Sequence, residues 1–110
     1  MLHKTADVKF TGDGSILTAL IEGEIDHHGA ALIRRLIDTK TAEDLPDTLC
    51  LDLSGVRFMD SSGLGLILGR YNNTVKLGIS FTVRNPSPSA ARIISAAGAE
   101  RIITIGYDEK

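Results

Sequence analysis

The sequence predicts an α/β fold, in which a mixed, mostly parallel β-sheet of about five strands is flanked by helices. Short apolar runs that alternate with polar residues, typical of strands, take turns with longer stretches that repeat apolar residues every three or four positions, typical of helices. The predicted order is β-β-α-β-α-β-α-β, which favours parallel pairing with the first strand added antiparallel. With 110 residues, the chain is expected to form a single domain over 1–110.

Two strands are expected to open the chain as a hairpin. Ala6, Val8 and Phe10 alternate with polar residues, and a second strand is predicted over 16–21. Between them, residues 11–15 contain two glycines and an aspartate, which tolerate the backbone conformations of a tight turn.

A first helix is expected over about 27–40, with Asp26 as its N-cap. Its inward face is predicted to carry Ala30, Ile33, Leu36 and Ile37. A polar connection over 40–47 would then lead into a buried strand over 49–53.

A second helix is expected over about 61–76 and ends at Gly78, a usual left-handed stop. Its apolar stripe recurs at i, i+3, i+4, i+7 and i+11 and consists of Leu64, Ile67, Leu68, Tyr71 and Val75. Asp60 or Ser61 can act as the N-cap, because a short oxygen-bearing side chain satisfies free backbone N–H groups. Ser62 then falls in the first turn, where N–H donors and the helix dipole would stabilise a phosphate.

The remaining predicted elements are a strand at 79–83, a helix at 90–97, a strand at 102–105 and a tail at 106–110. Ser87 and Pro88 supply a cap and a first-turn proline for that helix, and Gly98 is expected to stop it.

Composition excludes several classes of protein. The net charge is -2 and the basic residues are scattered, so no nucleic-acid partner is expected. Cys50, the single cysteine, lies in an apolar run and is expected to be buried without an intramolecular disulfide. The sequence contains no apolar core of a signal peptide and no apolar run of the ~18 residues that a membrane span needs. We therefore expect a cytoplasmic protein with no membrane partner.

Two polar segments follow strands that are expected to be parallel. The Asp26 loop follows the strand 16–21, and the Ser62 turn follows the strand 49–53. Because ligand and partner sites in open α/β sheets favour the carboxyl ends of the strands, these segments are predicted to form one surface.

These two segments also carry a family resemblance. Gly23-Glu-Ile-Asp-His-His28 and Phe58-Met-Asp-Ser-Ser-Gly-Leu-Gly-Leu-Ile-Leu-Gly-Arg-Tyr71 resemble the anti-sigma factor antagonists of the STAS domain family, in particular those that act in sporulation. The resemblance implies that Ser62 accepts phosphate from a partner that is both anti-sigma factor and serine kinase. Family members usually carry a further C-terminal helix, so a chain that stops at Lys110 is expected to have a somewhat less covered core.

The resemblance further implies a phosphorylation switch. The unphosphorylated form would bind the anti-sigma factor and release the sigma factor, phosphorylation would end that binding, and a phosphatase would reset it. The partner-binding surface is expected to include Asp26, His27, Asp60, Ser61, Gly63, Leu64, Gly65, Leu66, Gly69, Arg70 and Asn73. Within it, Leu66 is either an isolated exposed leucine or part of a docking patch, because Gly65 and Gly69 would let another chain approach closely.

Several alternatives remain open at this point. Ser61 is a rival phosphate acceptor, although it is better placed as the cap, and Asp60 either orients the Ser62 hydroxyl or only caps the helix.

Adjacent His27 and His28 do not point the same way, so no metal is expected. The sequence lacks a P-loop lysine and a nucleophile-base pair, so no enzyme and no cofactor are expected, and the partner would bring ATP. A scaffold subunit without phosphorylation, a nucleotide-binding enzyme and an appendage of an anion transporter are the rival classes.

Overall fold

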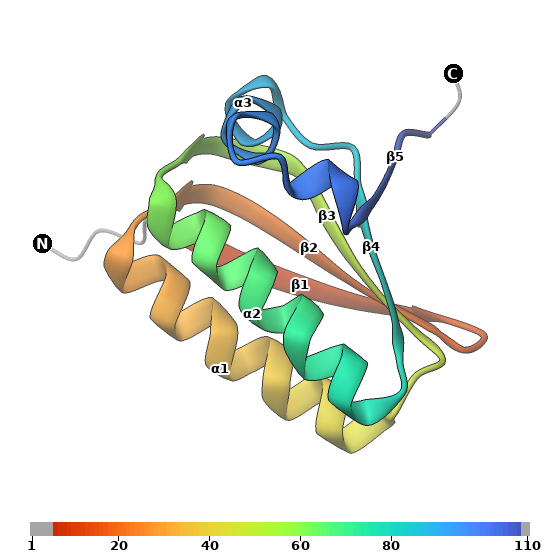
Figure 1. The fold of residues 1–110 in the computed structure, drawn as a ribbon. Coiled ribbons are helices and arrows are strands. Elements are labelled where there is room, and N and C mark those ends of the chain that lie inside the picture. Colours follow the sequence, from red (N-terminus) through yellow and green to blue (C-terminus); the bar gives the residue numbers. More distant parts are fainter. Residues whose placement is uncertain (1–5, 109–110) are drawn as a thin grey trace, which may run out of the picture.

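A computed structural model describes residues 6–108, and its five strands form one sheet in the order β1-β2-β3-β4-β5 (Figure 1). The strands are β1 (Ala6–Asp13), β2 (Ile16–Ile25), β3 (Thr48–Met59), β4 (Ser80–Arg84) and β5 (Thr104–Gly106). β1 pairs antiparallel with β2, and each later pair is parallel. The predicted fold class and element order are therefore confirmed.

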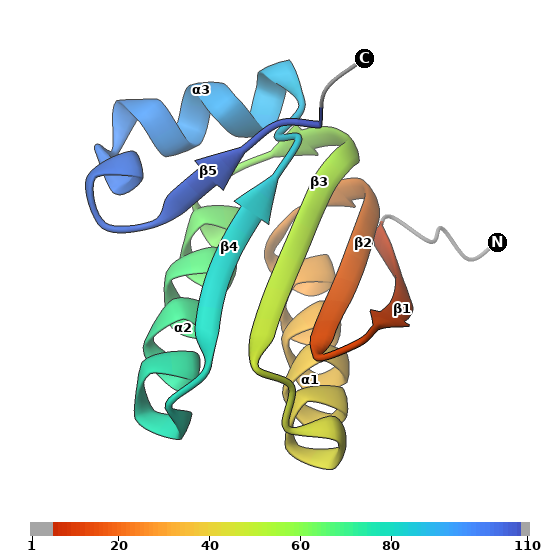
Figure 2. The same cartoon turned by 90° about the vertical axis from the view of Figure 1, so that its right-hand side faces the viewer.

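The helices are α1 (His27–Asp44), α2 (Ser61–Leu77) and α3 (Pro88–Ala96), followed by a 3₁₀ turn (Ala99–Arg101). α1 and α2 lie side by side on one face of the sheet, while α3 lies across the end at which β3 and β4 finish (Figures 1 and 2). Asp26 caps α1, Asp60 caps α2 and Ser87 caps α3, each through a side-chain oxygen that accepts a backbone N–H. The sequence thus specifies all three helix starts by local capping chemistry.

The hydrophobic core lies between the sheet and the two long helices. Side chains alternate along the central strands, so that Leu51 and Leu53 of β3 face inward and are fully buried. Ile33 and Ile37 of α1, four residues apart, and Ile67 of α2 are buried in the same core on this face of the sheet.

The apolar stripe predicted for α2 is only partly right. Ile67 is buried, and Leu64, Leu68 and Tyr71 are partly buried against the core, but Val75 is 59% exposed. The fully buried positions instead include Gly63, Leu66, Ile67, Arg70 and Thr74. The helix packs against α1 as well as against the sheet, so it buries two adjoining faces. The apolar stripe read from the sequence marks only one of these two faces.

The predicted boundaries of α1 are wrong at its carboxyl end. The helix continues through Asp44 and stops at Leu45, a left-handed cap with φ 45° whose N–H donates to the Thr41 carbonyl. The expected connection over 40–47 therefore begins five residues too early. Leu36, predicted to face inward, is 41% exposed, because the sheet contacts the face that carries Ile33 and Ile37.

β2 and β3 are longer than predicted, because both strands continue past residues that usually mark turns. The pairing shifts register between Leu20 and Glu22 and again between Gly23 and Glu24. Gly23 has φ 98°, so the strand bulges there without ending. On β3, Gly55 is paired with Glu22 of β2, and a Cβ atom on Gly55 would lie 2.8 Å from Cγ of Glu22. Glycine at this position therefore allows the two strands to stay paired. These extensions carry Asp26 and Asp60 to the same edge.

The carboxyl-terminal part also differs from expectation. α3 ends at Ala96, two residues before Gly98, which has φ 71° and starts the 3₁₀ turn. Gly106 belongs to β5, and Asp108 of the predicted tail pairs with Arg84 and Asn85. Residues 1–5, where no signal peptide was expected, and 109–110, the last of that tail, lie outside the described residues.

Two further expectations concern burial and membranes. Cys50 is buried, as predicted, and its burial raises the pKa of the thiol. Within residues 6–108, no helix is both long enough and apolar enough to cross a bilayer.

Gly63 sets how closely α2 approaches the end of β3. A Cβ atom there would lie 2.1 Å from Cγ of Met59 and 3.3 Å from Cγ2 of Ile25, both buried. Gly65, one half-turn away on the same helix, has no atom within 4 Å of the corresponding position. The two glycines therefore stand in opposite environments, although they are two residues apart.

We predict that Gly63→Ala lowers the free energy of unfolding by ~1–3 kcal/mol, because the added methyl group must displace Met59 from a packed core. Gly65→Ala is the matched control and should raise it by ~0.5–1 kcal/mol, because alanine is the better helix former and nothing opposes its methyl. Urea denaturation of both variants measures the difference. Equal effects of the two substitutions would contradict this close approach.

Candidate functional site

The starts of α1 and α2 meet at one edge of the sheet, as the sequence predicted. Asp26 Oδ1 accepts a hydrogen bond from the Gly29 N–H at 2.8 Å. Asp60 Oδ1 accepts one from the Ser62 N–H, also at 2.8 Å. The Asp60 N–H donates to the Ile25 carbonyl at 3.4 Å, which links the two loops directly. Two helix N-termini and two carboxylates thus share one small surface.

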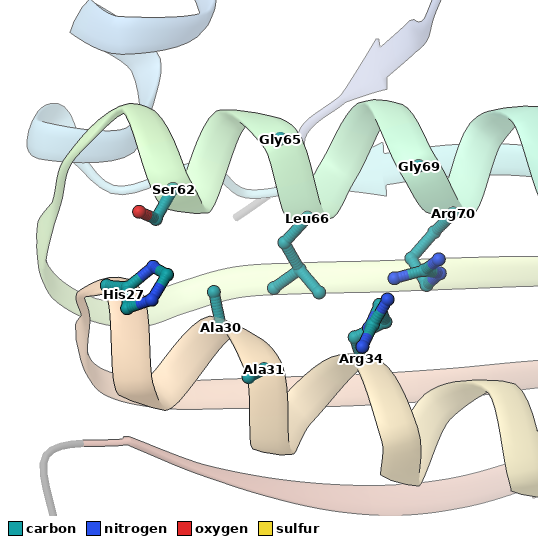
Figure 3. A pocket seen from close by; sticks show the side chains of 9 residues that line it. All are labelled: His27, Ala30, Ala31, Arg34, Ser62, Gly65, Leu66, Gly69 and Arg70. Atoms are coloured by element: carbon teal, nitrogen blue, oxygen red, sulfur yellow. The ribbon is translucent and has the colours of Figure 1, made fainter.

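Ser62 is the second residue of α2 and is half-buried. Its hydroxyl lies on the side of α2 that faces α1, across from the ring of His27 (Figure 3). The Asp60 carboxylate accepts a hydrogen bond from the backbone N–H of Ser62 and so lies next to this residue. Of the two caps that the sequence left open, Asp60 is the one observed. Ser61 is exposed and is the first helical residue, so the expectation that it is better placed as a cap than as a phosphate acceptor is wrong as far as capping is concerned.

A groove of about 440 Å³ runs between the two helices, with Ser62 at one end (Figure 3). Its lining consists of His27, Ala30, Ala31 and Arg34 from α1 with Ser62, Gly65, Leu66, Gly69 and Arg70 from α2. Two glycines and two alanines lie between Ser62 and the arginines, so the middle of the groove exposes backbone and methyl groups. A second chain can therefore approach this part of the surface closely.

Two of the predicted partner-facing residues are largely covered. Leu66 is 4% exposed and lies between α1 and α2 at the base of the groove, so it is not the exposed leucine that the sequence suggested. Arg70 is 7% exposed, and its Nε lies 2.8 Å from Oδ1 of Asp38 on α1. Both corrections follow from the packing of α2 against α1.

The structure brings together some of the other predicted partner residues but not all. His27, Gly65 and Gly69 line the groove with Ser62, and Asp26 and Asp60 cap the helices at its mouth. Gly63 is buried against Met59, and Leu64 packs partly against the core. Ser61 and Asn73 lie outside the lining of the groove.

The sequence did not predict three residues of α1 that line the groove. Ala30 was expected only in the core, and neither Ala31 nor Arg34 was expected at the site. The signal that could have found them is topological: helices that follow neighbouring parallel strands, with crossovers of one hand, lie side by side on one face. The α1 positions between its core face and its solvent face must then contact α2 or border a groove beside it.

His27 and His28 are in edge-to-face contact, with ring centroids 5.6 Å apart. Within the described part of the chain, no group of three or more His, Cys, Asp or Glu side chains is placed to hold a metal ion.

The sheet is five-stranded and mixed, and Ser62 lies in the first turn of a capped helix at its carboxyl edge. These features define the class of protein: a small α/β domain that presents a hydroxyl at a helix N-terminus beside a groove. Residues 7–110 match the model of the STAS domain family. The chain belongs to this family.

Curated relatives are similar over most of their length. The chain is 34% identical over 95 residues to the anti-sigma F factor antagonist of Paenibacillus polymyxa, which covers 86% of this chain and 80% of that protein. It is 32% identical over 85 residues to the anti-sigma-B factor antagonist of Bacillus subtilis (strain 168), covering 77% and 76%. Its relatives in the family are thus anti-sigma factor antagonists.

Solved structures of an anti-sigma factor antagonist have the same fold as this chain. The anti-sigma factor antagonist SpoIIAA in its unphosphorylated form matches with a TM-score of 0.76 and 26% identity, over 90% of this chain and 87% of that chain. The phosphorylated form of the Bacillus protein SpoIIAA matches with a TM-score of 0.70 over 90% of each chain, again at 26% identity. The fold of this chain is therefore shared with a protein known in both states.

We predict that Asp60→Ala lowers the free energy of unfolding by ~1 kcal/mol, because the Ser62 N–H loses its acceptor. Asp60→Asn keeps an oxygen in that place and should lose less. Thermal unfolding of the two variants beside the wild-type protein measures both effects. A loss as large for Asn as for Ala would show that the carboxylate charge, and not the hydrogen bond, stabilises the start of α2.

Proposed function

We propose that this chain is an anti-sigma factor antagonist that is switched by phosphorylation of Ser62. The observation that carries the proposal is the position of Ser62: half-buried at the second residue of α2, beside Asp60, at the mouth of the groove. Its membership of the STAS family and its similarity to anti-sigma factor antagonists support the same role.

The unphosphorylated protein docks the Ser62 end of the groove on an anti-sigma factor that is also a serine kinase, and so frees the sigma factor. The contact surface comprises the groove lining and the polar groups around its mouth, Asp26, Asp60 and Ser61, with Asn73 at its margin. The partner supplies ATP and Mg²⁺, and this chain supplies the hydroxyl. We place the exchange in the cytoplasm, within sporulation, and assign its reset to a separate phosphatase.

The charge of the phosphate accounts for release. A phosphoserine adds about -1.5 to -2 charges and three acceptor oxygens at pH 7. The Asp60 carboxylate already lies at that place, hydrogen-bonded to the Ser62 N–H, so a partner surface that fits the hydroxyl meets several negative charges after transfer. Like charges across an interface cost several kcal/mol, and each ~1.4 kcal/mol weakens binding tenfold.

The fold is expected to survive the modification. Ser62 lies in the first turn of α2, where the positive end of the helix dipole favours an added anion. The similarity of this chain to SpoIIAA in both its unphosphorylated and phosphorylated forms supports a switch without a large rearrangement. Release would then arise at the docking surface itself.

We predict that Ser62→Ala abolishes phosphate uptake from the cognate kinase while binding to that kinase persists, because only the acceptor oxygen is lost. Ser61→Ala is the matched control for the acceptor and should still take up one phosphate, because Ser61 lies outside the groove and the Ser62 hydroxyl is retained. Intact-mass measurement after incubation with kinase and ATP follows the reaction. Uptake by Ser62→Ala at the wild-type rate would refute the assignment of the site.

We also predict that Ser62→Asp binds the kinase at least about tenfold more weakly, because it introduces negative charge at the docking surface. Its unfolding temperature should stay close to that of the wild type, because an acidic residue in the first turn suits the helix dipole. Calorimetric titration and thermal unfolding test the two halves. Normal binding by a folded variant would exclude charge as the cause of release.

A further inference from the structure

The end of the groove opposite Ser62 is formed by two arginines. Arg70 projects from α2 towards α1, and Arg34 projects from α1 towards it, so that the two guanidinium groups face one another (Figure 3). None of the described residues that line the groove is acidic, although the whole chain carries a net charge of -2. The positive charge is therefore a local property of this groove.

Arg70 is incompletely paired. More than nine-tenths of its surface is buried, yet among the described residues its Nη1 has no hydrogen-bond partner. Its Nε lies 2.8 Å from Asp38 Oδ1, but the contact is not aligned as a hydrogen bond, so both atoms remain unsatisfied in that sense. A guanidinium that lies beside a groove, mostly buried and with part of its hydrogen-bonding capacity unused, is suited to an acceptor that arrives from outside.

The surroundings of Arg70 work against its charge. Burial lowers the pKa of its guanidinium, Asp38 opposes that shift, and the neighbouring Arg34 adds to it. Asp38 thus offsets only part of the unfavourable burial, and the approach of Arg34 makes it worse. An anion placed between the two arginines would relieve the repulsion between them.

We propose that Arg34 and Arg70 form a carboxylate-binding site, and that the carboxylate is an Asp or Glu side chain of the docking protein. The inference rests on the proposed function, which brings a protein to this groove. Guanidinium groups present forked donors that match a carboxylate. The groove between Ser62 and this site is walled by Gly65, Gly69, Ala30 and Ala31, which leaves room for a partner segment to lie along it.

The site is separate from the switch. Ser62 and Arg70 are eight residues apart on α2, which corresponds to ~12 Å along a helix. A phosphate on Ser62 therefore does not fill the space between the arginines. One partner segment can contact both places, and a phosphate on Ser62 does not displace its carboxylate from the arginine end directly. The arginines would then contribute to affinity and register, and Ser62 to release.

The test compares Arg34→Gln with Arg35→Gln in calorimetric titrations with the same kinase that phosphorylates Ser62. Both arginines are exposed and adjacent on α1, so the two variants lose the same charge, but Arg35 borders a different hollow beside Phe10 and Leu32. Arg34→Gln should bind at least about tenfold more weakly, and Arg35→Gln within about twofold of the wild type. Equal losses, or none, would overturn the site.

Charge exchange identifies the partner group. Arg34→Glu should abolish binding, and changing one acidic residue of the kinase at a time to Lys should restore it at a single position. If wild-type protein binds the kinase while Arg34→Gln binds equally well, this inference alone is wrong. If wild-type protein does not bind the kinase at all, the proposed function is wrong, and the carboxylate site that rests on it is wrong too.

Discussion

Parallel pairing of β2 with β3 is the constraint on which the site depends. The paired register extends to Ile25 and Met59, and the next residues of each strand are the caps Asp26 and Asp60. Because parallel strands finish at one edge, both helices begin there and run side by side across the same face of the sheet. The groove, its serine and its arginines all follow from that pairing. A one-residue slip of either strand would move its cap away from the other.

Features with local causes were predictable from the sequence. Asp26, Asp60 and Ser87 cap their helices through their own side chains, and Gly78 ends α2 with φ 72°. The strand order followed from alternation, and the shared edge followed from parallel pairing. The placement of Ser62 in a first turn needed only the cap and the helical period, so the position of this residue was predictable without coordinates.

Features with tertiary causes were not predictable in the same way. Leu66 and Arg70 looked exposed because the apolar stripe through Ile67 points at the sheet, whereas their own burial comes from α1. The extension of β2 past Gly23 depends on a bulge that a neighbouring strand stabilises. Arg34 entered the site only because two helices far apart in sequence adjoin. In each case a partner element, and not the local pattern, decided the outcome.

Gly65 and Gly69 connect stability to function. Neither has a positive φ, and neither has any atom within 4 Å of the position of a Cβ, so nothing inside the described fold requires glycine there. In a helix interior each glycine costs ~1 kcal/mol relative to alanine. Gly63, by contrast, is required by Met59. Glycine at these positions of α2 costs stability, but it leaves a surface on which the backbone of another chain can lie very close. So close a contact would leave little water between the partner and Ser62. Without that water, a phosphate on Ser62 is poorly screened, which is the condition under which a single modification can separate two proteins.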